Sequence, residues 1–383
     1  MFQSFFVYIS FGLILFVLGY LANIRQKNDI ANNRKTSFWV WEVLLALLVF
    51  GFVSGVRWNV GVDYMAYLNN YLNIQNGGSA LFDKEIGFEF ITNLFAKSRI
   101  HFSYYFGFLA FLQIFFIYRA FKDQRYLYPF LGIIIIFGPE YLSWMNGIRQ
   151  MLAATIFVYS IQFIQKRQLV KYVFTILLAS LFHTSALLLL VFYFIPQKDY
   201  FKNRWLTISL FVITLYLGTN NSWISILNNL GSALDFLGYD NISMRLEELI
   251  QETQIRTFGP RRFSLIIITL ITCWFQPLLK GYFKDTYFVT YYNLMIIGFL
   301  LFNLLGNTHH IFIRPLTYLS IFSIPTTAFL IVYLHKSIRK YFPILFIILI
   351  LTLSFLPLSI IVDNGKGNDD FTNYKFYWYH DNK

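Results

Sequence analysis

Long apolar stretches separated by short polar links recur along most of the 383 residues of this chain. A helix needs about 20 apolar residues to cross the hydrocarbon core of a bilayer, with a range of about 17–25. Windows near this length lie at residues 4–21, 38–56, 102–120, 127–142, 147–165, 205–219, 263–279, 287–305, 312–334 and 342–361. The pattern predicts an all-α polytopic membrane protein, in which the shorter windows are tilted or broken helices.

One apolar stretch, Leu169–Pro196, is too long for one ordinary span and too short for two full ones. Basic loops decide between one crossing and two, because Lys and Arg are enriched in cytoplasmic loops. Two crossings with a turn near His183 put six basic segments on one side: 25–35, 119–125, 166–171, 198–204, 280–284 and 335–340. We therefore predict about twelve spans in a single integral membrane domain, residues 1–383, with both termini outside.

The same topology places two long loops, 57–101 and 220–262, on the outer side of the membrane. Apolar residues recur near helical spacing from Phe82 to Phe95 and from Ile242 to Ile250. Each recurrence predicts an amphipathic helix that lies on the bilayer surface or caps a cavity.

The composition agrees with a membrane protein, since 57% of the residues are hydrophobic and only 13% are charged. The formal net charge of +12 suits an orientation signal and contact with anionic lipid head groups. We predict no nucleic-acid partner, because no soluble basic domain is present to bind one. The single Cys273 excludes an internal disulfide and a cysteine-based metal cluster.

Charged and aromatic residues follow the window 38–56 in the motif RWNVGVDYMAY. Asp63 and Tyr67 are four residues apart and would share one face of a helix. The Asp63 carboxylate could accept a proton from a sugar hydroxyl, while the rings of Tyr64 and Tyr67 stack on the sugar. The alternative is an interfacial aromatic belt in which Asp63 pairs with Arg57.

Two further acidic residues, Glu85 and Glu89 of the motif EIGFE, are also four residues apart. Like charges at this spacing repel each other on a helix. Nearby cations, or a use for two carboxylates, would explain the pair, and a solvated helix face is the alternative.

Arg149, in the motif NGIRQMLAATIFVYS, lies about one turn inside a predicted span. An arginine within a span is costly and usually faces a cavity or a partner. Its planar guanidinium suits a phosphate or pyrophosphate, whereas a snorkelling side chain at a helix end is the alternative. His183, in ASLFHTSAL, is a candidate general base, a hydrogen-bond donor to phosphate, or a packed core histidine.

Later arginines precede or begin other spans and could bind pyrophosphate or anchor helices at the interface. They are Arg256, Arg261 and Arg262 in RTFGPRRF, and Arg314 in RPLTY. The adjacent His309 and His310 suggest a metal, but no acidic or thiol partner stands at a ligand spacing. We therefore predict no metal and no cofactor.

Four motifs, RWNVGVDYMAY, EIGFE, NGIRQMLAATIFVYS and ASLFHTSAL, occur in this order across residues 50–195. This series resembles the EpsG family of bacterial membrane proteins, which belongs with the Wzy-type O-antigen and capsular polysaccharide polymerases. The resemblance implies a GT-C-like helical architecture and a metal-independent glycosyltransferase of the bacterial cytoplasmic membrane, with its active site on the outer side.

The resemblance also implies the partners, which are donor and acceptor oligosaccharides carried on undecaprenyl pyrophosphate, membrane lipids and, as an open option, a chain-length regulator. For the base that takes the acceptor proton, Asp63 comes first, with Glu85 and His183 behind it. The expected pyrophosphate ligands are Arg149 first, then Arg57, Arg261, Arg262 and Arg314. Contacts to sugar or other substrate groups are expected from Tyr64, Tyr67, Glu89, Gln150 and His309.

Three other functions stay open at this point. A ligase that transfers finished polymer, or a membrane acyltransferase, would use a similar scaffold. A transporter or flippase of lipid-linked sugars would favour midplane charges and inverted repeats, and we find no repeat in the sequence. A structural or sensory protein would explain the apolar spans but not the motifs gathered on one side.

Overall fold

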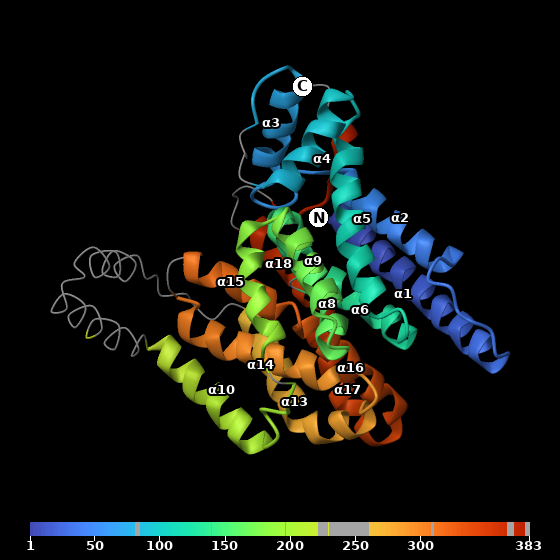
Figure 1. Ribbon diagram of the computed structural model, residues 1–383, viewed down its shortest axis with the longest axis vertical. Coiled ribbons are helices and arrows are strands. Elements are labelled where there is room, and N and C mark those ends of the chain that lie inside the picture. The colour runs from blue at the N-terminus through green and yellow to red at the C-terminus, as the bar shows by residue number, and fades with distance from the viewer. Residues whose placement is uncertain are drawn as a thin grey trace. The chain divides into compact units, whose positions relative to one another are not determined.

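The computed structural model describes residues 1–80, 85–138, 140–195, 197–220, 229, 260–307, 310–365 and 371–379. Within these residues the chain is mainly helical, with one two-stranded sheet (Figure 1). The predicted all-α membrane class is confirmed. The chain divides into two compact units, of which the first is Met1–Pro196 with Thr327–Lys383 and the second is Gln197–Thr326.

The amino-terminal part of the first unit contains twelve elements in chain order. They are α1 (Phe2–Ala31), α2 (Trp41–Gly55), β1 (Arg57–Trp58), α3 (Tyr64–Gln75), α4 (Ile86–Lys97), α5 (Phe102–Ala120), η1 (Arg125–Leu127), α6 (Tyr128–Phe137), α7 (Glu140–Asn146), α8 (Ile148–Gln165), α9 (Leu169–Ser180) and η2 (Thr184–Tyr193). Two helices from the later part of the chain, α17 (Ile338–Leu353) and α18 (Phe355–Gly365), belong to the same unit. A short carboxyl-terminal segment adds β2 (Lys375–Phe376) and η3 (Tyr377–Tyr379).

The second unit contains α10 (Arg204–Thr219), α13 (Pro260–Tyr282), α14 (Phe288–Leu305) and α15 (His310–Ser320). Helix α16 (Ser323–Lys336) begins in this unit and continues into the first. The predicted helix between Ile242 and Ile250 lies outside the described residues.

Six helical segments of the described chain are long and apolar enough to cross a membrane, or seven if a bent pair is counted as one span. The six are Phe2–Ala31, Phe102–Ala120, Arg262–Tyr282, Phe288–Leu305, Ile313–Lys336 and Ile338–Val362, and the bent pair is Arg125–Phe137 with Glu140–Asn146. Helices cover every predicted window, but the count of about twelve spans, the single domain, the loop bounds and the GT-C-like architecture stay predictions.

The ambiguous stretch 169–196 forms two short helices with His183 between them. α9 is an α-helix of 12 residues and η2 is a 3-10 helix of 10 residues, so each rises roughly 20 Å. The Tyr172 hydroxyl donates to the Leu189 carbonyl at 2.6 Å, which holds the returning segment against α9. The turn near His183 agrees with the sequence prediction.

The helices α2 and α5 approach closely where both carry glycine. A Cβ at Gly55 would lie 2.4 Å from the Ser103 carbonyl oxygen, and one at Gly51 would lie 2.9 Å from that of Gly107. Small residues allow two helix backbones to approach, as is common between helices in membranes. This contact fixes α5 against the end of α2, from which the motif at Arg57 continues.

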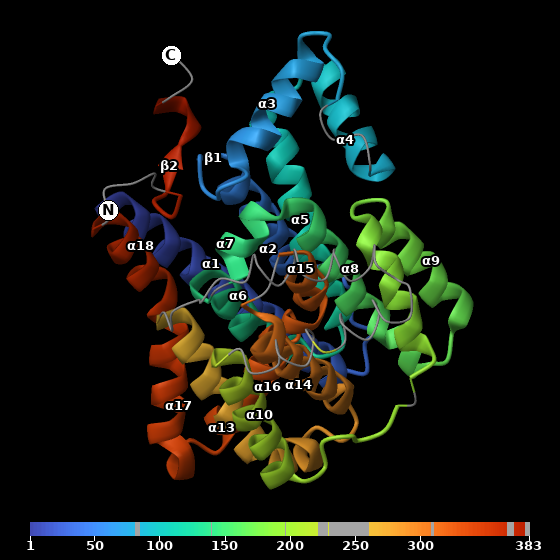
Figure 2. The same ribbon diagram turned by 90° about the vertical axis from the view of Figure 1, so that its left-hand side faces the viewer.

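The segment 371–379 returns to the start of the chain and pairs with β1 (Figure 2). Arg57 is the register partner of Phe376 in this antiparallel ladder. The Ser4 hydroxyl donates to Asn373 Oδ1 at 3.0 Å, and the Tyr8 hydroxyl donates to the Thr372 carbonyl at 3.1 Å. The start of α1, β1 and the carboxyl-terminal segment therefore lie together on one side of the unit.

Candidate functional site

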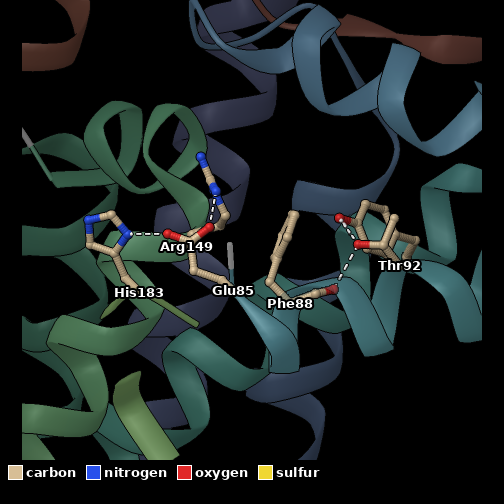
Figure 3. Close-up of polar contacts among 6 residues, drawn as sticks. Glu85, Phe88, Thr92, Arg149 and His183 are labelled. Atoms are coloured by element: carbon tan, nitrogen blue, oxygen red, sulfur yellow. Dashed lines mark hydrogen bonds and ion pairs between the residues drawn. The ribbon is translucent and has the colours of Figure 1, made fainter. Parts of the chain in front are cut away.

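Three of the four motifs contribute side chains to one cluster, made of Glu85, Arg149 and His183 (Figure 3). One oxygen of the Glu85 carboxylate, Oε2, accepts from Arg149 Nη1. The other oxygen, Oε1, lies 2.9 Å from His183 Nδ1. The Glu85 side chain is only 6% exposed, whereas those of Arg149 and His183 are 21% and 17% exposed. The cation and the imidazole are thus accessible, and the carboxylate that joins them is buried.

The start of α4 is attached to the turn that precedes His183. Glu85 is the residue immediately before this helix, and the N–H groups of Gly87 and Phe88 donate to the Leu181 carbonyl at 2.9 and 3.2 Å. These bonds satisfy amide groups that a helix leaves unpaired in its first turn. A Cβ at Gly87 would lie 2.7 Å from the Leu181 Cβ, so only glycine fits this contact. The motif EIGFE therefore places Glu85 next to His183.

Arg149 stands in the first turn of α8, directly after a break between α7 and α8. The buried Gln113 of α5 donates to the Trp144 and Ile148 carbonyls at 3.4 and 3.2 Å, which supports the backbone around the break. The Arg149 guanidinium lies 5.8 Å from the Tyr67 ring and 5.5 Å from the Phe88 ring. Aromatic faces attract a cation at these distances, so the two rings fix its position.

Tyr67 of α3 is also hydrogen bonded to Arg149. Burial raises the pKa of the Tyr67 hydroxyl, and the charge of Arg149 opposes that rise. The phenol is therefore neutral near pH 7 and accepts a hydrogen bond from the guanidinium.

The motif RWNVGVDYMAY packs against the end of α7, a few residues before Arg149. Gly61 has φ +96° and lies so near the Met145 carbonyl that a Cβ would be 3.0 Å from it. The Asp63 N–H donates to Asn146 Oδ1 at 2.8 Å, while Asp63 itself is exposed at the residue before α3. All four motifs thus meet around the start of α8, although Asp63 forms no ion pair with the cluster among the described residues.

Arg57 is fully buried and does not pair with Asp63 in the described part of the chain. Its guanidinium donates to the carbonyls of Ser54 and Val60, the second at 3.4 Å. It lies 5.4 Å from the Tyr64 ring and 5.0 Å from the Phe106 ring. Burial lowers the pKa of the Arg57 guanidinium. These contacts hold the link between α2 and α3.

The other predicted site residues lie in different surroundings. Tyr64 is buried and its hydroxyl donates to the Arg57 carbonyl at 3.1 Å. Glu89 is half-buried in the first turn of α4 and accepts from Asn93, and Gln150 is half-buried beside Arg149. In the second unit, Arg262 is half-buried on α13 and Arg314 is exposed on α15. Arg256, His309 and the Arg261 side chain lie outside the described residues, and the roles predicted for all these residues stay predictions.

Phe88, Gly87 and Gln113 support this cluster, but the sequence pattern did not single them out. Phe88 and Gly87 belong to the motif EIGFE. The three-residue spacing of Glu85 and Phe88 puts both on one side of a helix, where both can contact Arg149, and this was the available signal. Gln113 gave a weaker signal, as a lone amide in the apolar window 102–120. Among the described residues, no group of three or more His, Cys, Asp or Glu side chains could hold a metal ion.

The arrangement can bind an anion at Arg149 and move a proton through the Glu85–His183 pair. The helices and this cluster define a polytopic helical membrane protein with a charged site where several helices begin. The family model of the EpsG family matches residues 39–376, and the chain belongs to this family. Membership indicates a membrane protein of the polysaccharide polymerase type. Neither a curated protein nor a solved structure matches the chain.

Proposed function

We propose that the protein is a glycosyltransferase that polymerises oligosaccharide units carried on undecaprenyl pyrophosphate, at the outer face of the bacterial cytoplasmic membrane. Family membership supports the polymerase class. The proposed substrate and reaction rest on one observation, the contact of the buried carboxylate of Glu85 with both Arg149 and His183.

In the proposed reaction, the bond between the anomeric carbon of the donor chain and the pyrophosphate oxygen breaks, and that oxygen keeps the electron pair. A hydroxyl oxygen of the acceptor unit forms the new bond to the same carbon, and its proton passes to a base of the enzyme. Negative charge grows on the pyrophosphate while a proton leaves the acceptor. The site therefore needs a cation and a base close together.

Arg149 is the proposed cation. A guanidinium can donate to two oxygens of a pyrophosphate, and the 21% exposure of this side chain leaves it accessible to a ligand. Glu85 balances its charge before substrate binds. The rings of Tyr67 and Phe88 hold the guanidinium in position, so little side-chain entropy is lost on binding.

His183 is the proposed base. Contact of Glu85 with Nδ1 assigns the ring proton to that nitrogen and leaves Nε2 to accept the proton of the acceptor hydroxyl. A carboxylate that orients an imidazole in this way also stabilises the imidazolium that forms. Asp63, which the sequence puts first, stays an alternative base at the exposed start of α3.

The test uses purified protein in proteoliposomes with a lipid-diphosphate-linked repeat unit. Arg149→Ala should abolish polymer growth, because a lost cation at a departing anion costs about 10²–10³-fold in rate. The matched control is Arg25→Ala, since Arg25 also pairs with a buried carboxylate, that of Glu42, at 2.7 Å. Full-length polymer from Arg149→Ala would overturn the assignment.

The same assay separates the alternative functions. A ladder of products identifies a polymerase, whereas a single transfer of a finished chain identifies a ligase. Transfer of an acyl group, or movement of the lipid-linked unit without a new glycosidic bond, would identify an acyltransferase or a flippase instead.

A further inference from the structure

Helix α4 exposes a stripe of large apolar side chains. Ile86, Phe90 and Leu94 follow each other at intervals of four residues and are 73%, 66% and 52% exposed. The opposite face, with Phe88 and Thr92, is buried against the protein. Exposed contiguous apolar surface of this kind marks a contact with a partner or a membrane.

The position of α4 indicates whether a partner protein or the membrane covers this exposed stripe. The Phe95 ring lies 5.5 Å from the Phe108 ring of α5, and the hydroxyls of Thr92 and Tyr105 are 3.0 Å apart. α5 is one of the helices long and apolar enough to cross a membrane, and these contacts lie in its first two turns. α4 therefore lies beside a segment that is expected inside the bilayer.

Helix α9, whose end contacts the start of α4, also exposes an apolar face. Val170, Phe174, Leu178 and Leu181 share one side of that helix and are 67%, 68%, 40% and 40% exposed. In a polytopic membrane protein such a face contacts lipid. The amides at the start of α4 bind the carbonyl of Leu181, so the start of α4 meets the end of α9 (Figure 2).

We propose that α4 lies within the lipid leaflet, with Ile86, Phe90 and Leu94 covered by the acyl chains of bilayer lipids. Burial of Phe and Leu side chains in hydrocarbon is favourable, and it adds to the packing that already holds this short helix on its other side. The bilayer then fixes the depth of Glu85, which immediately precedes the helix, at the boundary between lipid and water. The proposal does not depend on the proposed reaction.

The test measures the accessibility of spin labels in vesicles of phosphatidylethanolamine and phosphatidylglycerol. Cys273 is the single cysteine and is buried, so Cys273→Ser gives a background for labelled Phe90→Cys and Leu94→Cys. Phe174→Cys on α9 is the lipid reference, and Asn69→Cys, at an exposed polar position of α3, is the water reference. Collision with oxygen reports lipid, and collision with a soluble nickel chelate reports water.

We expect labels at positions 90 and 94 to behave like the label at 174, with high oxygen and low nickel accessibility. Labels that resemble the one at 69 would overturn the proposal. Protection from both reagents that disappears on dilution of the protein in lipid would show that a second copy covers the stripe, and would overturn it as well. Polymerase activity does not enter the measurement, so an error in the proposed reaction would leave this result unchanged.

Discussion

At the scale of single residues, Glu85 has the central position because its two oxygens contact different partners. Oε2 accepts from Arg149 and Oε1 contacts His183. A buried carboxylate with one partner would only balance a charge, whereas this one also fixes the tautomer and direction of an imidazole. Glu85 also competes with any anion that approaches Arg149, which leads to a measurable consequence.

Glu85→Gln should strengthen the binding of inorganic pyrophosphate while it lowers transfer. The substitution removes the negative charge that competes with pyrophosphate for Arg149. If this competition costs about 1.4 kcal/mol of binding free energy, its removal makes binding roughly tenfold tighter. Transfer should fall because the amide no longer balances the charge of a protonated His183. Calorimetric titration with pyrophosphate and the transfer assay measure the two effects.

The control for this variant is Glu42→Gln, which alters a second arginine–carboxylate pair among the described residues of the first unit, that of Arg25 and Glu42. It should change neither the affinity for pyrophosphate nor the transfer rate by more than about twofold, because Glu42 is an independent site. Weaker pyrophosphate binding in Glu85→Gln would contradict the view that Glu85 and the anion compete for Arg149.

The sequence was sufficient to single out Arg149 and His183, because a charged or titratable residue within an apolar stretch is visible without a structure. It was insufficient to order the carboxylates. Asp63 and Glu85 both stand in polar motifs, and only tertiary packing shows that Asp63 is exposed while Glu85 is buried. The burial of Arg57 is likewise invisible in the sequence, because the rings around it come from α3 and α5.

At the scale of elements, the cluster depends on how α4 joins the end of α9. Two amides of α4 share the Leu181 carbonyl, and Gly87 provides the space for that approach. The sequence predicted an amphipathic helix in this region but not its contact with α9, because the two segments are distant in the chain. The spacing of apolar residues identifies the apolar side of a helix, but only the tertiary structure shows which segment packs against it.

Gly87→Ala should therefore separate Glu85 from His183. A methyl group 2.7 Å from the Leu181 Cβ must displace either helix, at a cost of about 1–3 kcal/mol, and transfer should fall more than pyrophosphate binding to Arg149. Gly281→Ala is the matched control, because a Cβ there meets nothing within 4 Å and alanine favours a helix by roughly 0.5–1 kcal/mol. Thermal unfolding in detergent and the transfer assay compare the two variants. Equal unfolding temperatures and equal transfer rates for Gly87→Ala and Gly281→Ala would refute the role of this contact.

At the scale of the whole molecule, strand pairing joins the carboxyl-terminal segment of the first unit to the link that follows α2. The pairing of β1 with β2 could not be predicted from local pattern, since each strand has only two residues and the two strands are far apart in the chain. The prediction that both termini lie outside is consistent with this arrangement, because the start of α1 and the segment 371–379 contact each other. The side of the membrane itself stays a prediction.

Removal of residues 371–383 should loosen the motif around Arg57 without unfolding the spans. The truncation deletes the bond from the Gly61 N–H to the Phe371 carbonyl at 3.0 Å and that from the Tyr377 N–H to the Val56 carbonyl at 3.1 Å. It also deletes Tyr374, which is buried and donates to the Val53 carbonyl at 2.5 Å. We expect amide hydrogen exchange to rise across residues 56–63, while amides inside α8 keep their protection because their partners are within the helix.

Removal of residues 380–383 alone is the control, and exchange across 56–63 should match that of the intact chain. The longer truncation should also slow transfer, because Gly61 and Asp63 contact the end of α7 immediately before Arg149. That decrease should be smaller than the loss in Arg149→Ala, since the cation remains and only its support is weakened. If the longer truncation leaves exchange at 56–63 unchanged, the carboxyl-terminal segment does not hold this motif, and the support of Arg149 does not depend on that segment.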